Sequence, residues 1–596
     1  MTKVKQLFDK AIKICDKFFL NPLTVVLFFY ILSILLIGPW GNFAVNDDFY
    51  YLMQVKAFSM GMFTKSALIG PTFILQAFIG LFWGEIFGIT YTSLRILTII
   101  VSILSIILID KTLVVLNVKK NIRTLALLLA AFNPYFYASS LSFMSETYFL
   151  FFTLWSLFYF LSFIKTKKNV YLLIASILGG LSMMIRQYGV VLLITYILVY
   201  LSANFKKIDP RRILSIMLPF VLLGCLGIFW PKFKSMSNPK SLDLSLFFVK
   251  PKHLLERLTS ISIVPYIAYF FLPFTIPFFV KLKKYTKGAI VFISLAPAYL
   301  IYKSNIFLIG NVFYFEGLYA RILPNVRENM LNNIPFKLFA AYFISVSLCT
   351  MIYFLLSKLH ELVKKIKIKE FIDITGTSDY LYFLTLAVSL IGFYLIVLIT
   401  DRVYDRYFIN LFIVSILFVS LVANRLNFNP KKLSLLVCSL MCVITFLLVF
   451  DFYKVNQLKW KLANRISNEM GVDKFKIFLD NVYMRTTYMD LVQNYEGIYS
   501  ARPDYYNPVC FVQEYTKRNE NIFNTILIYV ESRAKVQRYF PNPLIPSAYL
   551  LKGLSKKFKP ATDVLFYNEE YQSPIYNILG IRTFVRAFCI GDSIIK

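Results

Sequence analysis

Three carboxylates at the ends of long apolar segments are the first candidates for chemistry in this sequence. Asp47 and Asp48 follow the first apolar segment as a pair, and Glu146 lies at the start of another. Two adjacent carboxylates at such a position are costly to desolvate together, which favours a raised pKa for one of them. The alternatives are a pair of solvated loop acids and, for Glu146, helix N-terminal capping together with Ser142.

Three arginines lie at comparable positions and suit the binding of a phosphate. Arg95 opens an apolar segment, Arg186 lies in a tight turn between two others, and Arg406 starts a later one. A guanidinium presents a rigid fork of donors that matches phosphate oxygens. The alternative is that each arginine snorkels or pairs with a nearby aspartate. Glu316, Arg321 and Arg327 are weaker candidates for the same site.

The elements that position these residues belong to a membrane protein. Of the 596 residues, 58% are hydrophobic and only 16% are charged, too few to cover a water-soluble protein of this length. Apolar runs of about 20 residues recur, each long enough to cross a bilayer as a helix, and the alternating pattern of a β-barrel is missing. We therefore predict an α-helical polytopic membrane protein. With only two histidines, a histidine-rich metal site is excluded.

Thirteen transmembrane helices are predicted from these apolar runs. The stretch 71–88 is also apolar, but Pro71, Gly84, Glu85 and Gly88 interrupt it, so we predict an interfacial or re-entrant helix there. The thirteen predicted spans are 22–40, 93–116, 123–139, 144–164, 170–185, 187–202, 212–230, 262–281, 287–303, 337–357, 380–400, 407–424 and 433–453.

The basic residues orient the predicted topology. They gather before the first span and in every second connection after it, for example Lys119 with Lys120 and Lys206 with Lys207. Because basic loops stay in the cytoplasm, the N-terminus is predicted inside, and all six candidate residues lie outside. The same loops explain most of the net charge of +32, so we predict no nucleic-acid partner. A smaller basic excess elsewhere suits the anionic phosphates of membrane lipids.

Two domains are predicted. Residues 1–453 form the transmembrane domain, with a first external loop over 41–92, and an odd number of spans places residues 454–596 outside as a small α/β domain. Cys510 and Cys589 are the only cysteines of that second domain, which allows a disulfide in an oxidising compartment. Its predicted elements are a helix over 457–470 and strands over 475–479, 524–530, 563–567 and 582–590.

Taken in order, these motifs resemble those of the GT-C membrane glycosyltransferases. The resemblance is closest to the group that contains the protein O-mannosyltransferases and the lipid A aminoarabinose transferases. Asp47-Asp48-Phe49-Tyr50-Tyr51 resembles the Asp-Glu-x-x-Tyr motif of their first external loop, and the likeness covers roughly residues 20–200. Further similar pieces are Gly88-Ile89-Thr90 before Arg95, Asn133-Pro134 before Glu146, Gly179-Gly180-Leu181 before Arg186, and Asp405-Arg406-Tyr407.

The resemblance implies an inverting transfer of a hexosyl or pentosyl group from a polyprenyl-phosphate donor to an acceptor hydroxyl. Asp47 matches the family's catalytic aspartate, the general base. Asp48 stands where the family has Glu, and Glu146 matches its second acidic position. The candidates for holding the lipid phosphate are Arg95, Arg186 and Arg406.

Two aspects of the implied reaction are left open by the sequence. A divalent cation, Mg²⁺ or Mn²⁺, could assist with oxygen ligands from the acids, although no metal cage can be identified. The acceptor could be a lipid, a glycopolymer or a protein, and neither it nor the sugar is named by the residues.

Three other functions fit parts of the pattern. A polysaccharide polymerase or ligase also uses polyprenyl-linked donors, but it usually places a large outer loop between late spans. Here the largest soluble part follows the last span. A transporter or flippase of lipid-linked glycans would show internal repeats or charges at mid-membrane, and neither is clear. A scaffold whose outer domain binds a partner is not excluded by the sequence.

Overall fold

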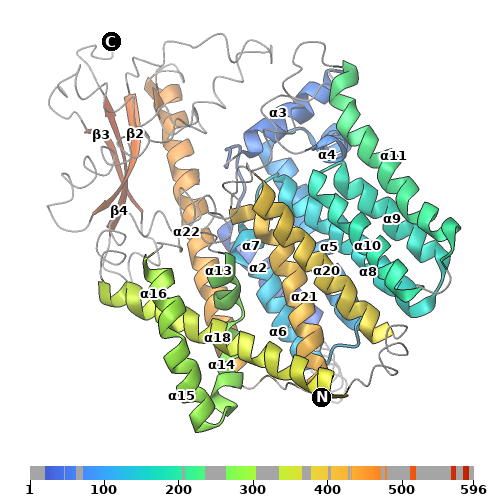
Figure 1. Cartoon of the computed structure of the whole chain (residues 1–596). Coiled ribbons are helices and arrows are strands. Elements are labelled where there is room, and N and C mark those ends of the chain that lie inside the picture. The colour runs from blue at the N-terminus through green and yellow to red at the C-terminus, as the bar shows by residue number, and fades with distance from the viewer. Residues whose placement is uncertain are drawn as a thin grey trace, which may run out of the picture.

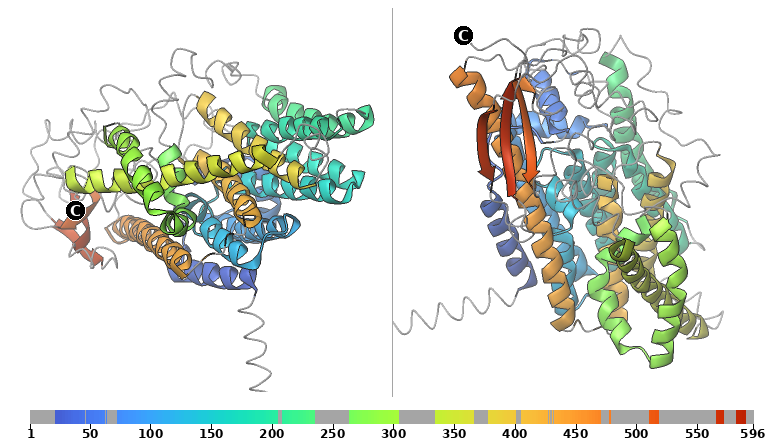
Figure 2. Two further views of the ribbon diagram at one scale, coloured as in Figure 1. Left: turned by 60° about the horizontal axis from the view of Figure 1, so that its bottom comes forward. Right: turned by 90° about the vertical axis from the view of Figure 1, so that its left-hand side faces the viewer.

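The computed structural model is a bundle of helices accompanied by a small sheet (Figure 1). Two further views show the long helices lying side by side, with α18 crossing over the others (Figure 2). The structure describes residues 21–45, 47–61, 63, 72–204, 208–234, 263–303, 334–365, 378–400, 405–426, 428, 430, 432–470, 477–478, 510–517, 565–571 and 582–589.

The described helices fall into two groups along the chain. The first group comprises α2 (Pro22–Ile37), α3 (Asp48–Ser59), α4 (Ile74–Phe87), α5 (Tyr91–Val115), α6 (Lys120–Ala131), α7 (Pro134–Ser139), α8 (Ser145–Thr166), α9 (Asn169–Met183), η1 (Gln187–Gly189), α10 (Val190–Ala203) and α11 (Pro210–Lys234). The second group comprises α13 (Ile263–Phe270), α14 (Leu272–Lys281), α15 (Lys284–Ile293), α16 (Leu295–Lys303), α18 (Ile334–Lys365), α20 (Ser378–Ile399), η5 (Asp405–Phe408), α21 (Ile409–Arg425) and α22 (Lys432–Met470).

These helices make the protein a multi-pass membrane protein, as predicted. Every predicted span overlaps at least one helix, and six helical segments of the described residues are long and apolar enough to cross a membrane. The number of thirteen spans stays a prediction. Among the six segments, α8 and residues 406–425 are the most enclosed, each with 78% of its most apolar window buried. Both carry candidate residues at their first turns.

Prolines divide some of the predicted spans. The prediction of one helix over 123–139 is wrong, because α6 ends at Ala131 and α7 begins at Pro134. Proline has no N–H for the helix ladder but suits a first helical position. Asn133 caps the new helix by accepting a hydrogen bond from the backbone N–H of Tyr135 at 3.1 Å. In the same way, the predicted span 262–281 is two helices, α13 and α14, the second of which has a proline in its first turn.

Two glycines of α9 allow α11 to approach it closely. A Cβ atom added to Gly179 would lie 2.2 Å from Cζ of Phe220, and one added to Gly180 would lie 2.8 Å from the backbone oxygen of Pro219. No side chain fits at such distances, so a larger residue would push the two helices apart. Because α9 leads directly to Arg186, this packing fixes the end of the helix from which that arginine projects.

The described C-terminal residues include a four-stranded sheet in the order β1-β2-β4-β3, formed by β1 (Ile477–Phe478), β2 (Cys510–Lys517), β3 (Leu565–Tyr571) and β4 (Arg582–Cys589). β1 runs parallel to β2, and the other pairs are antiparallel. The predicted strands at 475–479, 563–567 and 582–590 each overlap an observed one, β2 was not predicted, and the strand predicted over 524–530 lies outside the described residues. The register places Cys510 opposite Cys589.

Candidate active site

Four of the six predicted residues meet in one cluster of ion pairs. Asp47 is the N-cap residue of α3 and Glu146 lies in the first turn of α8. Arg186 lies between α9 and η1, and Arg406 is in η5, just before α21. Residues from four separate parts of the chain therefore share one place, and we call these four the charged cluster.

Glu146 is the centre of the charged cluster. Its Oε1 atom lies 2.6 Å from Nη2 of Arg186 and 3.0 Å from Nε of Arg406. The side chains of all three residues are almost fully buried, with exposed fractions of 2% for Glu146, 6% for Arg186 and 5% for Arg406. Burial, the largest single influence, would lower the pKa of Arg186. The adjacent Glu146 carboxylate and the nearby tyrosine hydroxyls together outweigh it and raise the pKa, so this guanidinium stays charged.

Asp47 is the member of the charged cluster that solvent can reach. Its Oδ2 atom accepts a hydrogen bond from Nη2 of Arg406 at 2.6 Å, yet 38% of its side chain is exposed. Arg406 therefore bridges an exposed carboxylate and the buried carboxylate of Glu146. The geometry offers a base that a substrate can approach, backed by two buried cations.

Three neighbours that the motif analysis did not assign a role complete the surroundings. Ser145 Oγ accepts a hydrogen bond from Nε of Arg186 at 3.0 Å, and the Tyr51 hydroxyl lies 3.4 Å from the same Oγ. The ring of Tyr407 lies 4.7 Å from the guanidinium carbon of Arg186, a cation–π arrangement. Burial, followed by the nearby Glu146 carboxylate, raises the pKa of Tyr51, so it stays protonated. All three residues lie next to or within the motifs, and this proximity in the sequence was the only indication that they could belong to the site.

The turn that carries Arg186 is held by the start of α4. The backbone N–H of Phe73 donates to the carbonyl of Ile185 at 2.9 Å, and that of Leu75 donates to Met184 at 3.3 Å. These N–H groups are among the first of α4, which have no partner within their own helix. The predicted interfacial or re-entrant helix is therefore a real helix, and one of its structural roles is to support the Arg186 turn.

Asp48 and Arg95 form a second pair instead of joining the charged cluster. Nη2 of Arg95 lies 3.6 Å from Oδ2 of Asp48, and both side chains are buried. Asp48 also accepts a hydrogen bond from the backbone N–H of Val45 at 2.7 Å. Arg95 donates to the carbonyl oxygens of Pro39 and Phe43, both at 2.7 Å. Both side chains of this pair therefore form hydrogen bonds with the backbone that precedes Asp47.

The Asp48 carboxyl has an altered acidity that predicts a pH effect. Burial, opposed by Arg95, raises its pKa from 3.8 to about 7. The folded protein therefore holds a proton that the unfolded chain releases, so this stabilisation is complete below the unfolded pKa and is lost as the pH rises through 7. We expect the melting temperature of the wild type to fall from about pH 5 to about pH 8 relative to Asp48→Asn, which cannot titrate. Parallel curves for the two proteins would contradict the prediction.

The remaining sequence predictions concern three further residues and a metal ion. Glu316, Arg321 and Arg327 lie outside the described residues. Among the residues that the structure describes, no group of three or more His, Cys, Asp or Glu side chains could hold a metal ion. In the charged cluster, each of the two carboxylates contacts a guanidinium through one of its oxygens.

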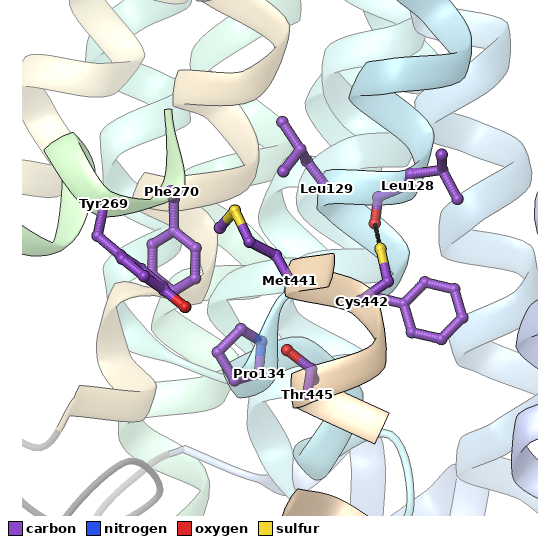
Figure 3. Close-up of a pocket in the computed structure, with 9 residues that line it drawn as sticks. Leu128, Leu129, Pro134, Tyr269, Phe270, Met441, Cys442 and Thr445 are labelled. Atoms are coloured by element: carbon purple, nitrogen blue, oxygen red, sulfur yellow. Dashed lines mark hydrogen bonds between the residues drawn. The ribbon is translucent and has the colours of Figure 1, made fainter. Parts of the chain in front are cut away.

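A small apolar pocket lies elsewhere, between α6, α13 and α22 (Figure 3). Leu128, Phe270 and Met441 line it, and the Cys442 thiol points toward the carbonyl oxygen of Leu128 at 3.8 Å. None of the six predicted residues contributes to it. Its lining, as the structure describes it, contains no charged side chain.

Comparisons with known proteins bear on the same part of the chain. Residues 70–233 match the family model described as dolichyl-phosphate-mannose-protein mannosyltransferase. No curated protein matches the chain. Two crystal structures of ArnT from Cupriavidus metallidurans, one bound to undecaprenyl phosphate and one in the apo state, align over 95% and 94% of this chain and 97% of theirs. At 11% identity and TM-scores of 0.37 and 0.35, that likeness defines neither the fold nor the activity here.

The family match covers the segment in which much of the site is built. It includes α4 and α8, the turn of Arg186, and Arg95 on α5. The motifs described above resemble those of the same group of enzymes. Over residues 70–233 the match confirms the resemblance of this chain to the GT-C membrane glycosyltransferases.

Proposed function

We propose that this protein is a membrane glycosyltransferase that moves a sugar from a polyprenyl-phosphate donor to an acceptor hydroxyl. The observation that carries the proposal is the charged cluster, in which an exposed carboxylate is backed by two buried arginines. The family match over residues 70–233 supports the same class of reaction. As part of the proposal, the N-terminus is cytoplasmic, and both the cluster and the C-terminal domain 454–596 are on the outer side.

The arginines of the charged cluster suit the leaving group. As the bond between the sugar C1 and the phosphate oxygen breaks, negative charge grows on the polyprenyl phosphate. Arg186 and Arg406 are buried and fixed by Glu146 before substrate arrives, and preorganised cations lower the energy of such a charge more than mobile ones do. We assign the phosphate to these two residues.

Asp47 suits the role of the base. The acceptor oxygen attacks C1 from the side opposite the phosphate, which inverts the configuration, and its proton passes to the Asp47 carboxylate. In the resting structure Arg406 holds that carboxylate at 2.6 Å. A donor phosphate that takes over Arg406 would release Asp47 for the acceptor, so donor binding and activation of the base are linked.

The proposed function is tested with purified protein in lipid nanodiscs. Polyprenyl phosphates that carry different labelled hexoses or pentoses are offered together with lipid, glycopolymer and peptide acceptors. We expect at least one donor to release polyprenyl phosphate as its label moves to an acceptor. Transport of an intact labelled lipid across a bilayer, without cleavage of any donor, would support the flippase alternative and overturn the proposal.

We expect the transfer to survive removal of divalent cations. The carboxylates of the charged cluster already contact arginines, which supply the positive charge that a metal would otherwise bring. Turnover in excess EDTA should stay within about twofold of the untreated value, given the full charge compensation by guanidinium groups. An inactive EDTA-treated enzyme that Mg²⁺ or Mn²⁺ restores would contradict this expectation.

A further inference from the structure

The segment 38–45 joins α2 to α3 and ends two residues before Asp47. Two glycines shape it, with φ of 55° at Gly38 and 124° at Gly41, conformations that other residues rarely adopt. The segment belongs to no helix or strand, so its carbonyl groups need partners from other parts of the molecule. The side chains that supply those partners control where Asp47 lies.

One partner comes from α5. Arg95 has an exposed fraction of 0% and binds the carbonyls of Pro39 and Phe43, while its guanidinium carbon lies 4.5 Å from the centre of the Phe43 ring. Arg95 also contacts the carboxylate of Asp48, the first residue of α3. Arg95 thus connects the segment to α3, the helix that begins directly after Asp47.

A second partner comes from α22, near the other end of the chain. Gln457 Nε2 donates to the carbonyl of Gly38 at 2.5 Å and to that of Trp40 at 3.0 Å. A primary amide nitrogen carries two hydrogens, and here both point to the same segment. This residue belongs to none of the motifs that suggested the site.

Tyr453 lies one turn earlier on α22 and contacts both sides of the site. Its ring packs edge-on against Phe43 at 6.4 Å between centroids. Its hydroxyl donates to the carbonyl of Leu141 at 2.7 Å, in the connection that leads to Glu146. α22 therefore holds the backbone before each carboxylate of the charged cluster, and it also packs against β2 and β4 (Figure 1).

We propose that Gln457 and Tyr453 are positioning residues for the transfer and set the place of Asp47 through the segment 38–45. This inference rests on the proposed function, because it assigns their effect to the base of that reaction. Neither residue contacts the charged cluster, so loss of their hydrogen bonds would move Asp47 without removing the arginines that hold the donor phosphate. Displacements of about 1 Å can lower a rate up to about 100-fold.

The test compares three variants of α22. Gln457→Glu keeps the shape but replaces a donating amide by a carboxylate facing two carbonyl oxygens, whereas Gln457→Lys keeps a donor. Lys461→Gln, at an exposed position of the same helix, is the control. We expect Gln457→Glu to lower kcat by about 10- to 100-fold while KM for the donor stays within about twofold. Gln457→Lys should recover most of kcat, and Lys461→Gln should match the wild type.

Hydrogen exchange of the peptide spanning residues 38–48 gives a readout that does not depend on activity. It should be faster in Gln457→Glu and normal in the control. If the wild type transfers no sugar, the proposed function is wrong. Faster exchange in Gln457→Glu would then still show that Gln457 holds the segment 38–45 in place. An active wild type whose Gln457→Glu variant has unchanged kcat, or a raised KM with unchanged kcat, would overturn the positioning role.

Discussion

Replacement of Asp47 by asparagine is expected to lower the turnover of sugar transfer by about 100- to 10,000-fold, the usual contribution of a general base. Asparagine keeps the size of the side chain and can still accept a hydrogen bond from Arg406. It cannot take the proton of the acceptor hydroxyl. Because the arginines are untouched, KM for the donor should stay within about threefold of the wild type. The measurement is release of polyprenyl phosphate per folded protein.

Asp110→Asn is the matched control for this prediction. Asp110 also forms a partly buried aspartate–arginine contact of 2.6 Å, with Arg123, but it lies away from the charged cluster. It should reproduce any general cost of breaking such a pair and leave turnover unchanged. Normal turnover in Asp47→Asn, or an equal loss in both variants, would contradict the assignment of Asp47 as the base.

The second large effect is expected on stability. Glu146→Gln would leave Arg186 and Arg406 buried side by side without the carboxylate that both contact. Removing one partner of a buried ion pair typically costs about 3–5 kcal/mol, because an uncompensated buried charge remains. We therefore expect a large drop in melting temperature in detergent, with greater loss of folded protein during purification.

An exposed ion pair provides the comparison for that stability effect. Glu469 pairs with Arg465 near the end of α22, where their exposed fractions are 59% and 47%. Glu469→Gln should change the stability by less than about 1 kcal/mol, since solvent screens such pairs. If Glu146→Gln is as stable as Glu469→Gln, Glu146 does not compensate the two buried arginines of the charged cluster.

The sequence could predict that the six candidate residues lie on one side of the protein, but not which of them form the charged cluster and which form a separate pair. The order of the motifs and the alternation of basic loops placed all six candidates on one side, and four of them meet. Asp47 and Asp48 could not be separated, because neighbouring residues at a helix start point in directions about 100° apart. Only the packing of α5 shows that Asp48 faces Arg95. Hydrophobic patterns carry no information on such a choice.

The fold was predictable where the apolar pattern is long and was less so at its interruptions. Most spans lie close to observed helices, yet Asn133-Pro134 and Pro273 each end one helix and begin another. The last span and the separate helix predicted over 457–470 are one continuous helix, α22. The backbone hydrogen bonds of a helix lie within the helix itself, so a helix can continue across the boundary between lipid and water. That continuity is what brings Gln457 to the segment before Asp47.

The most direct measurement of the central claim is the place at which the protein holds a lipid phosphate. A polyprenyl phosphate with a photoreactive group on its first isoprene unit is bound to the protein in nanodiscs, crosslinked and mapped by mass spectrometry. We predict adducts next to the charged cluster, in the first turns of α8 and α21 and in the turn of Arg186. Adducts confined to the opposite ends of these helices, around Thr166 and Arg425, would contradict the claim.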